Sequence, residues 1–266
     1  MGIRIRSRVR IGPIPNYIDP DAQAFITAAG ITNPTQQTAI NTLVISLKAN
    51  GLWTKMKALY PFVGGTATTH KFNLKDPRDL NVAFRLTMFG GLTHDSNGVK
   101  GNGTNAYMDT NLNCRDFLVG ARMSMGNYVR LAAVGGGSQC DGVRDTAISS
   151  WLEIDYTSLN TRNPEQGGVI NFATTPLRLS QTVRSSSTRL DMYINGTSVG
   201  NNITSTTLLN PNHNVYIFAR NTIGTAGNFS TIQSSFFYIA SSLTQAEAIT
   251  LNTLVNNFQI TLGRQV

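Results

Sequence analysis

Apolar and polar positions alternate strictly near the start of the chain. Residues 3–11 read Ile-Arg-Ile-Arg-Ser-Arg-Val-Arg-Ile, and a period of two is the spacing of an extended strand. One face of such a strand carries four arginines, and the other carries β-branched residues that favour extension. The residues predicted to dock on a partner are Ile3, Arg4, Ile5, Arg6, Arg8, Val9 and Arg10.

Two prolines follow this alternation. Pro13 and Pro15 lack backbone N–H donors and hold the chain away from any continuing sheet. We therefore interpret residues 1–18 as an extended basic arm that lies on another subunit's sheet edge or in an acidic groove. The alternative is that residues 3–11 form the first strand of the protein's own sheet.

A helical period replaces the alternation after residue 18. Asp19-Pro20 and Asn33-Pro34 each combine an N-cap residue with a proline for the first helical turn. We expect residues 19–59 to form a helical segment that attaches the chain or holds its oligomer. The predicted helical ranges are 22–29, 35–50 and a further turn over 52–59.

From residue 60 onward, short apolar or alternating runs are separated by Gly, Asn, Asp and Ser clusters, which is typical of a β-sandwich. Asn195-Gly196 predicts a two-residue hairpin turn. Thr244 to Phe258 predicts a closing helix, because Thr244 and Glu247 form a capping box. The predicted strands are His70–Leu74, Ala83–Phe89, Ala106–Thr110, Phe117–Met123, Val129–Val134, Ile148–Asp155, Gly168–Thr174, Leu177–Val183, Thr188–Ile194, Asn214–Arg220 and Ser234–Ser241.

The charge of the chain is concentrated in the arm. The formal net charge is +8, but four of the 22 Lys and Arg residues lie in residues 3–11, so the remainder carries only +4. Charged residues make up 14% of the chain, against about 25% in ordinary soluble domains. Nucleic-acid binding is therefore not favoured, and no apolar run is long enough to insert into a membrane. Cys114 and Cys140 are predicted to be free, buried thiols.

Several motifs resemble a known family. Arg-Leu-Asp-Met-Tyr-Ile-Asn-Gly-Thr-Ser-Val at 189–199, Val-Tyr-Ile-Phe-Ala-Arg at 215–220 and the segment 237–247 resemble the closing strands and terminal helix of laminin-G-like, concanavalin A-like domains. Gly-Val-Lys-Gly-Asn-Gly-Thr-Asn-Ala-Tyr-Met-Asp-Thr at 98–110 resembles the opening strand. The resemblance implies a mainly β protein. Its lectin-like jelly-roll sandwich over 60–266 follows the arm and short helices and is closed by a C-terminal helix.

A second resemblance concerns the junction. Leu-Trp-Thr-Lys-Met-Lys-Ala-Leu-Tyr-Pro-Phe-Val-Gly-Gly at 52–65, with His-Lys-Phe-Asn-Leu at 70–74 and the segment 261–266, is similar to a module of bacteriophage structural proteins. This implies a virion component such as a head fibre, tail fibre or decoration protein. Its partners would be capsid or tail proteins, its own copies in a homo-oligomer such as a trimer, and a host surface glycan.

One acidic motif bears on catalysis. Glucanases of the sandwich fold carry Glu-x-Asp-x-Glu on one strand face, whereas this chain reads Glu153-Ile-Asp-Tyr-Thr157. Thr157 cannot supply the proton that the third carboxylate gives. We expect no enzyme and two solvent-facing acids, with a glycan-active hydrolase as the alternative.

Sugar binding calls for an aromatic surface beside amide or carboxylate groups. Tyr107 is one aromatic residue that could provide part of such a surface, in addition to the candidates named below. No cofactor is expected; calcium would use Asp141 and Asp145, or Asp95 and Asn97, whose oxygens suit that ion. The three histidines have no zinc spacing. The candidate glycan contacts are Trp151, Tyr156, Asn160 and Asn163.

Overall fold

A computed structural model describes residues 17–117, 122–146, 150–158, 160–165, 170–171, 177–186, 189–202 and 211–266, without the side chains of 117, 150–151, 161–165 and 202. The predicted docking residues of the arm, Ile3 to Arg10, lie outside this part of the chain. Among the described helices, none is both long and apolar enough to cross a membrane.

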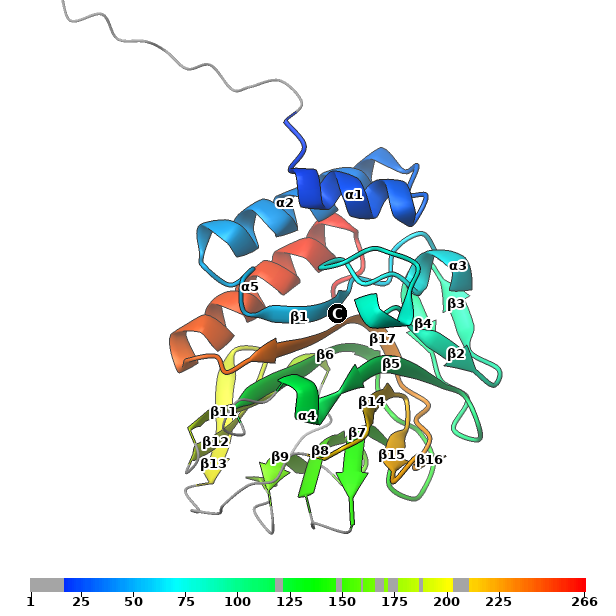
Figure 1. Cartoon of the computed structure of the whole chain (residues 1–266), viewed down its shortest axis with the longest axis vertical. Helices are drawn as coiled ribbons and strands as arrows, with labels where there is room; N and C mark the ends of the chain where they lie inside the picture. The colour runs from blue at the N-terminus through cyan, green and yellow to red at the C-terminus, as the bar shows by residue number, and fades with distance from the viewer. Residues whose placement is uncertain are drawn as a thin grey trace, which may run out of the picture.

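The elements stack in three layers (Figure 1). Helix α5 packs on one face of an eight-stranded sheet, α2 packs on α5 and α1 on α2, and a nine-stranded sheet packs against the other face. The structure is therefore the predicted mainly β sandwich with short N-terminal helices and a C-terminal helix. The helices are α1 (Pro20–Ala28), α2 (Pro34–Ala49), α3 (Ala67–His70), α4 (Cys114–Phe117) and α5 (Gln245–Thr261), with a 3-10 turn over Asn81–Ala83.

The eight-stranded sheet runs in the order β13-β12-β11-β6-β17-β4-β3, and β1 also pairs with β17. Its strands are β1 (Met56–Tyr60), β3 (Thr93–Asp95), β4 (Gly98–Lys100), β6 (Met123–Leu131), β11 (Arg178–Ser186), β12 (Arg189–Ile194), β13 (Thr197–Asn202) and β17 (Gln233–Ser241).

The nine-stranded sheet runs in the order β10-β9-β8-β7-β14-β5-β2. Strand β15 pairs with β7 in parallel and with β16. Its strands are β2 (Thr87–Phe89), β5 (Tyr107–Asn113), β7 (Cys140–Asp145), β8 (Ser150–Asp155), β9 (Asn160–Glu165), β10 (Ile170–Asn171), β14 (Asn214–Ile217), β15 (Arg220–Thr222) and β16 (Thr225–Gly227).

Strand β17 is buried on both faces. Phe236 and Tyr238 belong to the core under the helices, whereas Phe237 and Ile239 belong to the core between the sheets. A central strand with two buried faces reads as a continuous apolar run rather than an alternation. This strand therefore joins the two cores of the molecule.

The predicted helix signals are confirmed at three N-termini. The side chains of Asp19, Asn33 and Thr244 each accept a hydrogen bond from a backbone N–H of the first turn. Glu247 completes the capping box of α5. The Asn195-Gly196 turn is also confirmed, because both residues have positive φ, at 51° and 76°.

Two predictions between residues 52 and 74 are wrong, and a third, over 83–89, is confirmed only in part. Residues 56–60 form strand β1 rather than a helical turn, because they complete the edge of the sheet beside β17. β1 spans residue 60, and buried residues of α1 and α2 belong to the same core as Tyr128, Leu179 and Phe236 of the eight-stranded sheet. Residues 70–74 are not a strand, since His70 ends helix α3. Only the end of 83–89 is a strand, β2.

Predictions for the remaining strands are largely confirmed, within the described part of the chain. Residue 117, at the start of the predicted strand 117–123, belongs to helix α4 instead. Residues 118–121, 148–149, 168–169 and 172–174 of the predicted strands lie outside the described part of the chain. No predicted strand covers β3, β4, β7, β9, β13 or β16, and the centre of β6 lies between the predicted ranges 117–123 and 129–134. Gly142 interrupts β7 and Pro164 interrupts β9, and both residue types weaken a strand signal.

Candidate functional site

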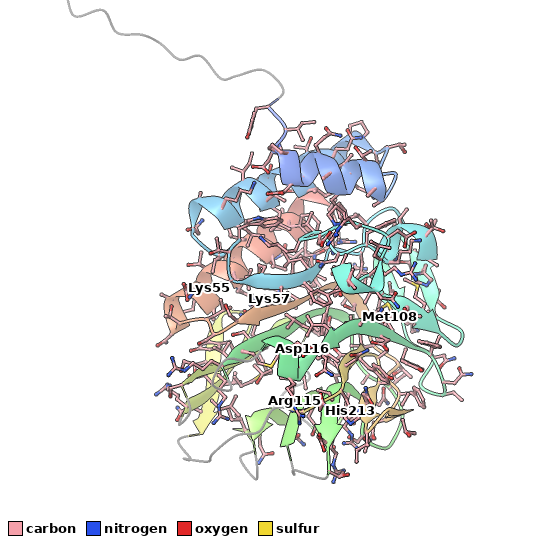
Figure 2. All side chains as sticks on the ribbon, in the orientation of Figure 1. Lys55, Lys57, Met108, Arg115, Asp116 and His213 are labelled. Carbon is pink, nitrogen blue, oxygen red and sulfur yellow. The ribbon has the colours of Figure 1, made fainter. Side chains whose placement is uncertain are left out.

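The outer face of the nine-stranded sheet carries the candidate site. On β5, Met108 and Leu112 point into the core between the sheets. Strand residues alternate between faces, so Tyr107, Asp109 and Asn111 lie on the outer face. Figure 2 labels Met108, the inward neighbour of both Tyr107 and Asp109.

Four rings form an aromatic row on this face. Phe89 of β2 stacks on Tyr107 with ring centroids 4.6 Å apart and planes within 11°. Tyr107 lies 4.8 Å from Tyr216 of β14 and 6.2 Å from Phe229. Phe89, on the edge strand, is 41% exposed and contacts a ring on one side only among the described residues. The row therefore ends in an open ring face.

Asp109 supplies hydrogen-bonding capacity beside the aromatic row. Its carboxylate accepts from the backbone N–H of Asn111 at 2.7 Å and from Asn214 Nδ2 at 3.2 Å. It lies across from Thr87 on β2 and from Tyr216 on β14. Burial raises the pKa of Asp109, although the two hydrogen bonds favour the charged form and oppose the increase. A half-buried acceptor thus lies in the middle of the row.

The two tyrosine hydroxyls of the row remain protonated donors. Burial and the nearby Asp109 carboxylate raise the pKa of Tyr107, and burial, Asp109 and Tyr107 raise that of Tyr216 to about 12. Neither hydroxyl forms a hydrogen bond to a residue in the described part of the chain. Tyr107 is half-buried and Tyr216 is only 7% exposed, so a ligand reaches the Tyr107 hydroxyl more readily than that of Tyr216.

A groove of about 330 Å³ adjoins the row at the sheet edge. Its lining includes Lys71, next to helix α3, together with Arg85 and Thr87. Lys71 Nζ lies 2.6 Å and Arg85 Nη1 lies 2.8 Å from the Asp79 carboxylate. We call the aromatic row with Asp109 and this groove the open end of the outer face.

The opposite part of the face, which we call the closed end, contains Glu153, Asp155, Cys140 and Arg220. The expectation of two solvent-facing acids is wrong, because Glu153 and Asp155 are only 5% and 3% exposed. Arg220 Nη1 lies 3.4 Å from Glu153. It comes from β15, whose register places it beside Gly142, a residue with no side chain to separate the two.

Asp155 is saturated by neighbouring donors. Its carboxylate accepts from the Ser138 hydroxyl, from the Thr157 hydroxyl at 3.1 Å and from the Ser158 backbone N–H at 2.9 Å. Burial raises its pKa, but these bonds outweigh burial and lower it overall. A glycosidase acid needs a raised pKa. Asp155 therefore does not fit that role.

Cys140, the cysteine of the closed end, is not a reactive thiol. Cys140 is buried, and burial together with Glu153 and Asp155 raises its pKa well above the ordinary range. Cys114 is buried as well. The prediction of free, buried cysteines is confirmed.

The structure places the predicted glycan contacts unevenly. The prediction that Tyr156 contacts a glycan is wrong, because Tyr156 is buried and its hydroxyl donates to Asp141 between the sheets. Asn160 is half-buried at the start of β9. Trp151 lies on β8 opposite Arg144 and Asn163 lies on β9, and their side chains lie outside the described part of the chain.

The oxygens considered for calcium have protein partners. Asp141 accepts from Asn127 Nδ2 at 2.6 Å and from the Phe218 backbone N–H at 2.7 Å, besides Tyr156. Burial raises the pKa of Asp141 to about 6, although these hydrogen bonds act to lower it. Asp145 accepts from the Asn212 N–H, and Asp95 from the Asn97 N–H. Within the described residues, no group of three or more His, Cys, Asp or Glu is arranged to hold a metal.

Comparisons with known proteins identify the fold. No protein-family model and no curated protein matches the chain. A crystal structure of a receptor-binding domain superposes on 79% of this chain with a TM-score of 0.52 and 12% identity. The binding domain of botulinum neurotoxin DC, in complex with rat synaptotagmin II, covers 78% with a TM-score of 0.52 and 12% identity. The binding domain of serotype D covers 76% with a TM-score of 0.51 and 7% identity.

The chain spans about half the length of these structures, 52% in each case. At such identities the likeness establishes the fold alone. The fold is the β-sandwich arrangement found in these receptor-binding domains.

Proposed function

We propose that this protein is a non-enzymatic glycan-binding protein and that the open end of the outer face is its binding site. The observation that carries the proposal is the aromatic row, which ends in the exposed ring of Phe89 and lies beside Asp109 and two tyrosine hydroxyls that have no partner among the described residues. A fold shared with receptor-binding domains supports a role in recognition.

The chemistry of the row suits a sugar. A pyranose ring has an apolar face of C–H groups that packs on an aromatic ring, and the outward side of Phe89 offers such a surface. Sugar hydroxyls donate to carboxylates and accept from phenols. Asp109 and the hydroxyls of Tyr107 and Tyr216 supply one acceptor and two donors at the same place.

The test is a binding screen of the full chain against bacterial surface and algal polysaccharides. We expect Tyr107→Ala to weaken binding about 30-fold, which is about 2 kcal/mol, because it removes both a hydroxyl donor and the ring on which Phe89 stacks. Tyr17→Ala is the matched control, since Tyr17 is 54% exposed and lies far from the row in the sequence and outside its contacts. Absence of binding by the wild type to every polysaccharide would sink the proposal.

We also propose that the protein is carried on a bacteriophage particle as a homo-oligomer and docks through residues 3–10. The resemblance of the junction to phage structural modules and the alternating arm support this setting. Replacing Arg4, Arg6, Arg8 and Arg10 with serine is expected to abolish association with particles while leaving glycan binding intact. Unchanged association of this variant, or a monomer by light scattering, would contradict the setting.

A further inference from the structure

We propose that the open end recognises acidic glycans and places a sugar carboxylate in the groove between Lys71 and Arg85. This inference rests on the proposed function and names its ligand class. It is carried by the position of the two cations in a groove whose lining residue Thr87 lies on the same strand as Phe89 of the aromatic row.

The groove and the row share strand β2. Thr87 lines the groove, and Phe89 lies two residues further along the same strand. Alternate residues of a strand point to the same face about 6.6–6.8 Å apart. One ligand can therefore contact the Phe89 ring and reach the groove at the same time.

The two cations retain unused donors. Arg85 donates from Nε to Asn81 Oδ1 at 3.0 Å and from Nη1 to Asp79 at 2.8 Å, and its Nη2 has no partner in the described part of the chain. Lys71 Nζ carries three protons and has one oxygen partner there, Asp79. A ligand carboxylate finds donors on both side chains.

The charges around the groove favour one orientation of the ligand. Lys71 and Arg85 against Asp79 leave a net charge of +1 at the groove. Asp109 lies one strand further in, on β5, where it accepts hydrogen bonds from neutral sugar hydroxyls. An acidic sugar thus points its carboxylate towards α3 and its hydroxyls towards β5. An acidic peptide matches the cations but makes no use of the phenols and the exposed ring.

Asp79 is the internal competitor of such a ligand. Its hydrogen bonds to Lys71 and Arg85 outweigh burial and lower its pKa, so it stays ionised at neutral pH. Because Asp79 is exposed, a ligand carboxylate can displace it. Removing its charge frees both cations.

The experiment measures binding of the full chain to polygalacturonate, alginate and polysialic acid, each beside its carboxyl-reduced form. We expect at least one acidic polymer to bind about tenfold more tightly than its reduced form at low salt, and the difference to shrink in high salt. Arg85→Gln is expected to remove this preference, and Arg78→Gln, at an exposed cation outside the groove, to preserve it. Asp79→Asn is expected to strengthen acidic binding about threefold, which a misfolded variant cannot imitate.

Equal affinity for each acidic polymer and its reduced form would overturn this inference and leave the proposed function intact. So would weaker acidic binding by Asp79→Asn, or polyglutamate binding as tight as any acidic glycan and insensitive to Tyr107→Ala. Failure of all polymers, acidic and reduced, together with failure of the polysaccharide screen, would overturn both proposals.

Discussion

The open and closed ends lie on the same face of one sheet, and both contain carboxylates, but they differ in how these carboxylates are satisfied. At the closed end, Glu153 and Asp155 are buried among Arg220, Ser138, Thr157 and the backbone. At the open end, Asp109 is half-buried between tyrosines whose hydroxyls have no partner among the described residues.

The comparison shows that carboxylate spacing on a strand does not define a site. Glu153 and Asp155 have the alternation of a glucanase motif, but their hydrogen-bonding capacity is used by the protein itself. Buried polar groups that are fully paired contribute to structure. Groups that are partly exposed and lack partners are those that a ligand can engage.

The largest expected effect concerns Asp141, which is buried between the two sheets. It joins β6, β7 and the Phe218 backbone between the sheets. Asp141→Ala leaves three buried donors without an acceptor, so we expect a loss of about 4 kcal/mol in the free energy of unfolding. Urea denaturation measures it. Asp116→Ala, at an exposed position, is the control and should change stability by less than about 0.5 kcal/mol.

The pH dependence of stability gives the next effect. Folding raises the pKa of Asp141 from 3.8 to about 6, so the folded state holds the proton more tightly than the unfolded state. The stability from this group is fully present below pH 4 and is lost as pH rises through 6, by about 3 kcal/mol as an upper estimate. The difference between wild type and Asp141→Asn, measured from pH 4 to 7, should follow this curve. A difference that is flat with pH would contradict the assignment.

A pair of variants tests the two ends directly. Asp109→Asn at the open end should weaken glycan binding about tenfold, because a charged acceptor is replaced by a neutral one. Glu153→Gln at the closed end should leave binding unchanged. Titration of both variants with the same glycan measures the two affinities. Weaker binding by Glu153→Gln with unchanged binding by Asp109→Asn would place the binding site at the closed end instead.

The smallest effect is on stability at the closed end. Glu153→Gln weakens the pairing with Arg220, and we expect a loss of about 1 kcal/mol. Assays for released sugars on the same polysaccharides should find no turnover by the wild type. Turnover that disappears in Glu153→Gln would restore the hydrolase alternative.

Local signals in the sequence predicted the helix starts and the hairpin turn, because an N-cap residue or an Asn-Gly pair acts over a few positions. Strand β1 was misread as a helical turn, because its pairing with β17 joins segments about 180 residues apart. Tertiary pairing of this kind overrides local propensity.

The site was predictable only in part. The alternation in Tyr107-Met-Asp-Thr-Asn-Leu-Asn113 indicates that Tyr107 and Asp109 share a face. Phe89 and Tyr216 carry no such signal, since their place in the row depends on the register of β2 and β14 against β5. The burial of Glu153 and Asp155 likewise depends on Arg220 and Ser138, which come from other segments.

The most direct test of the open end as the binding site is hydroxyl-radical footprinting of the wild-type chain with and without a saturating polysaccharide that it binds. Oxidation of Phe89 and Tyr107 should fall on binding, while that of Tyr17 should stay the same. Protection confined to other residues, with Phe89 and Tyr107 oxidised as in the free protein, would contradict the assignment of the open end as the glycan-binding site.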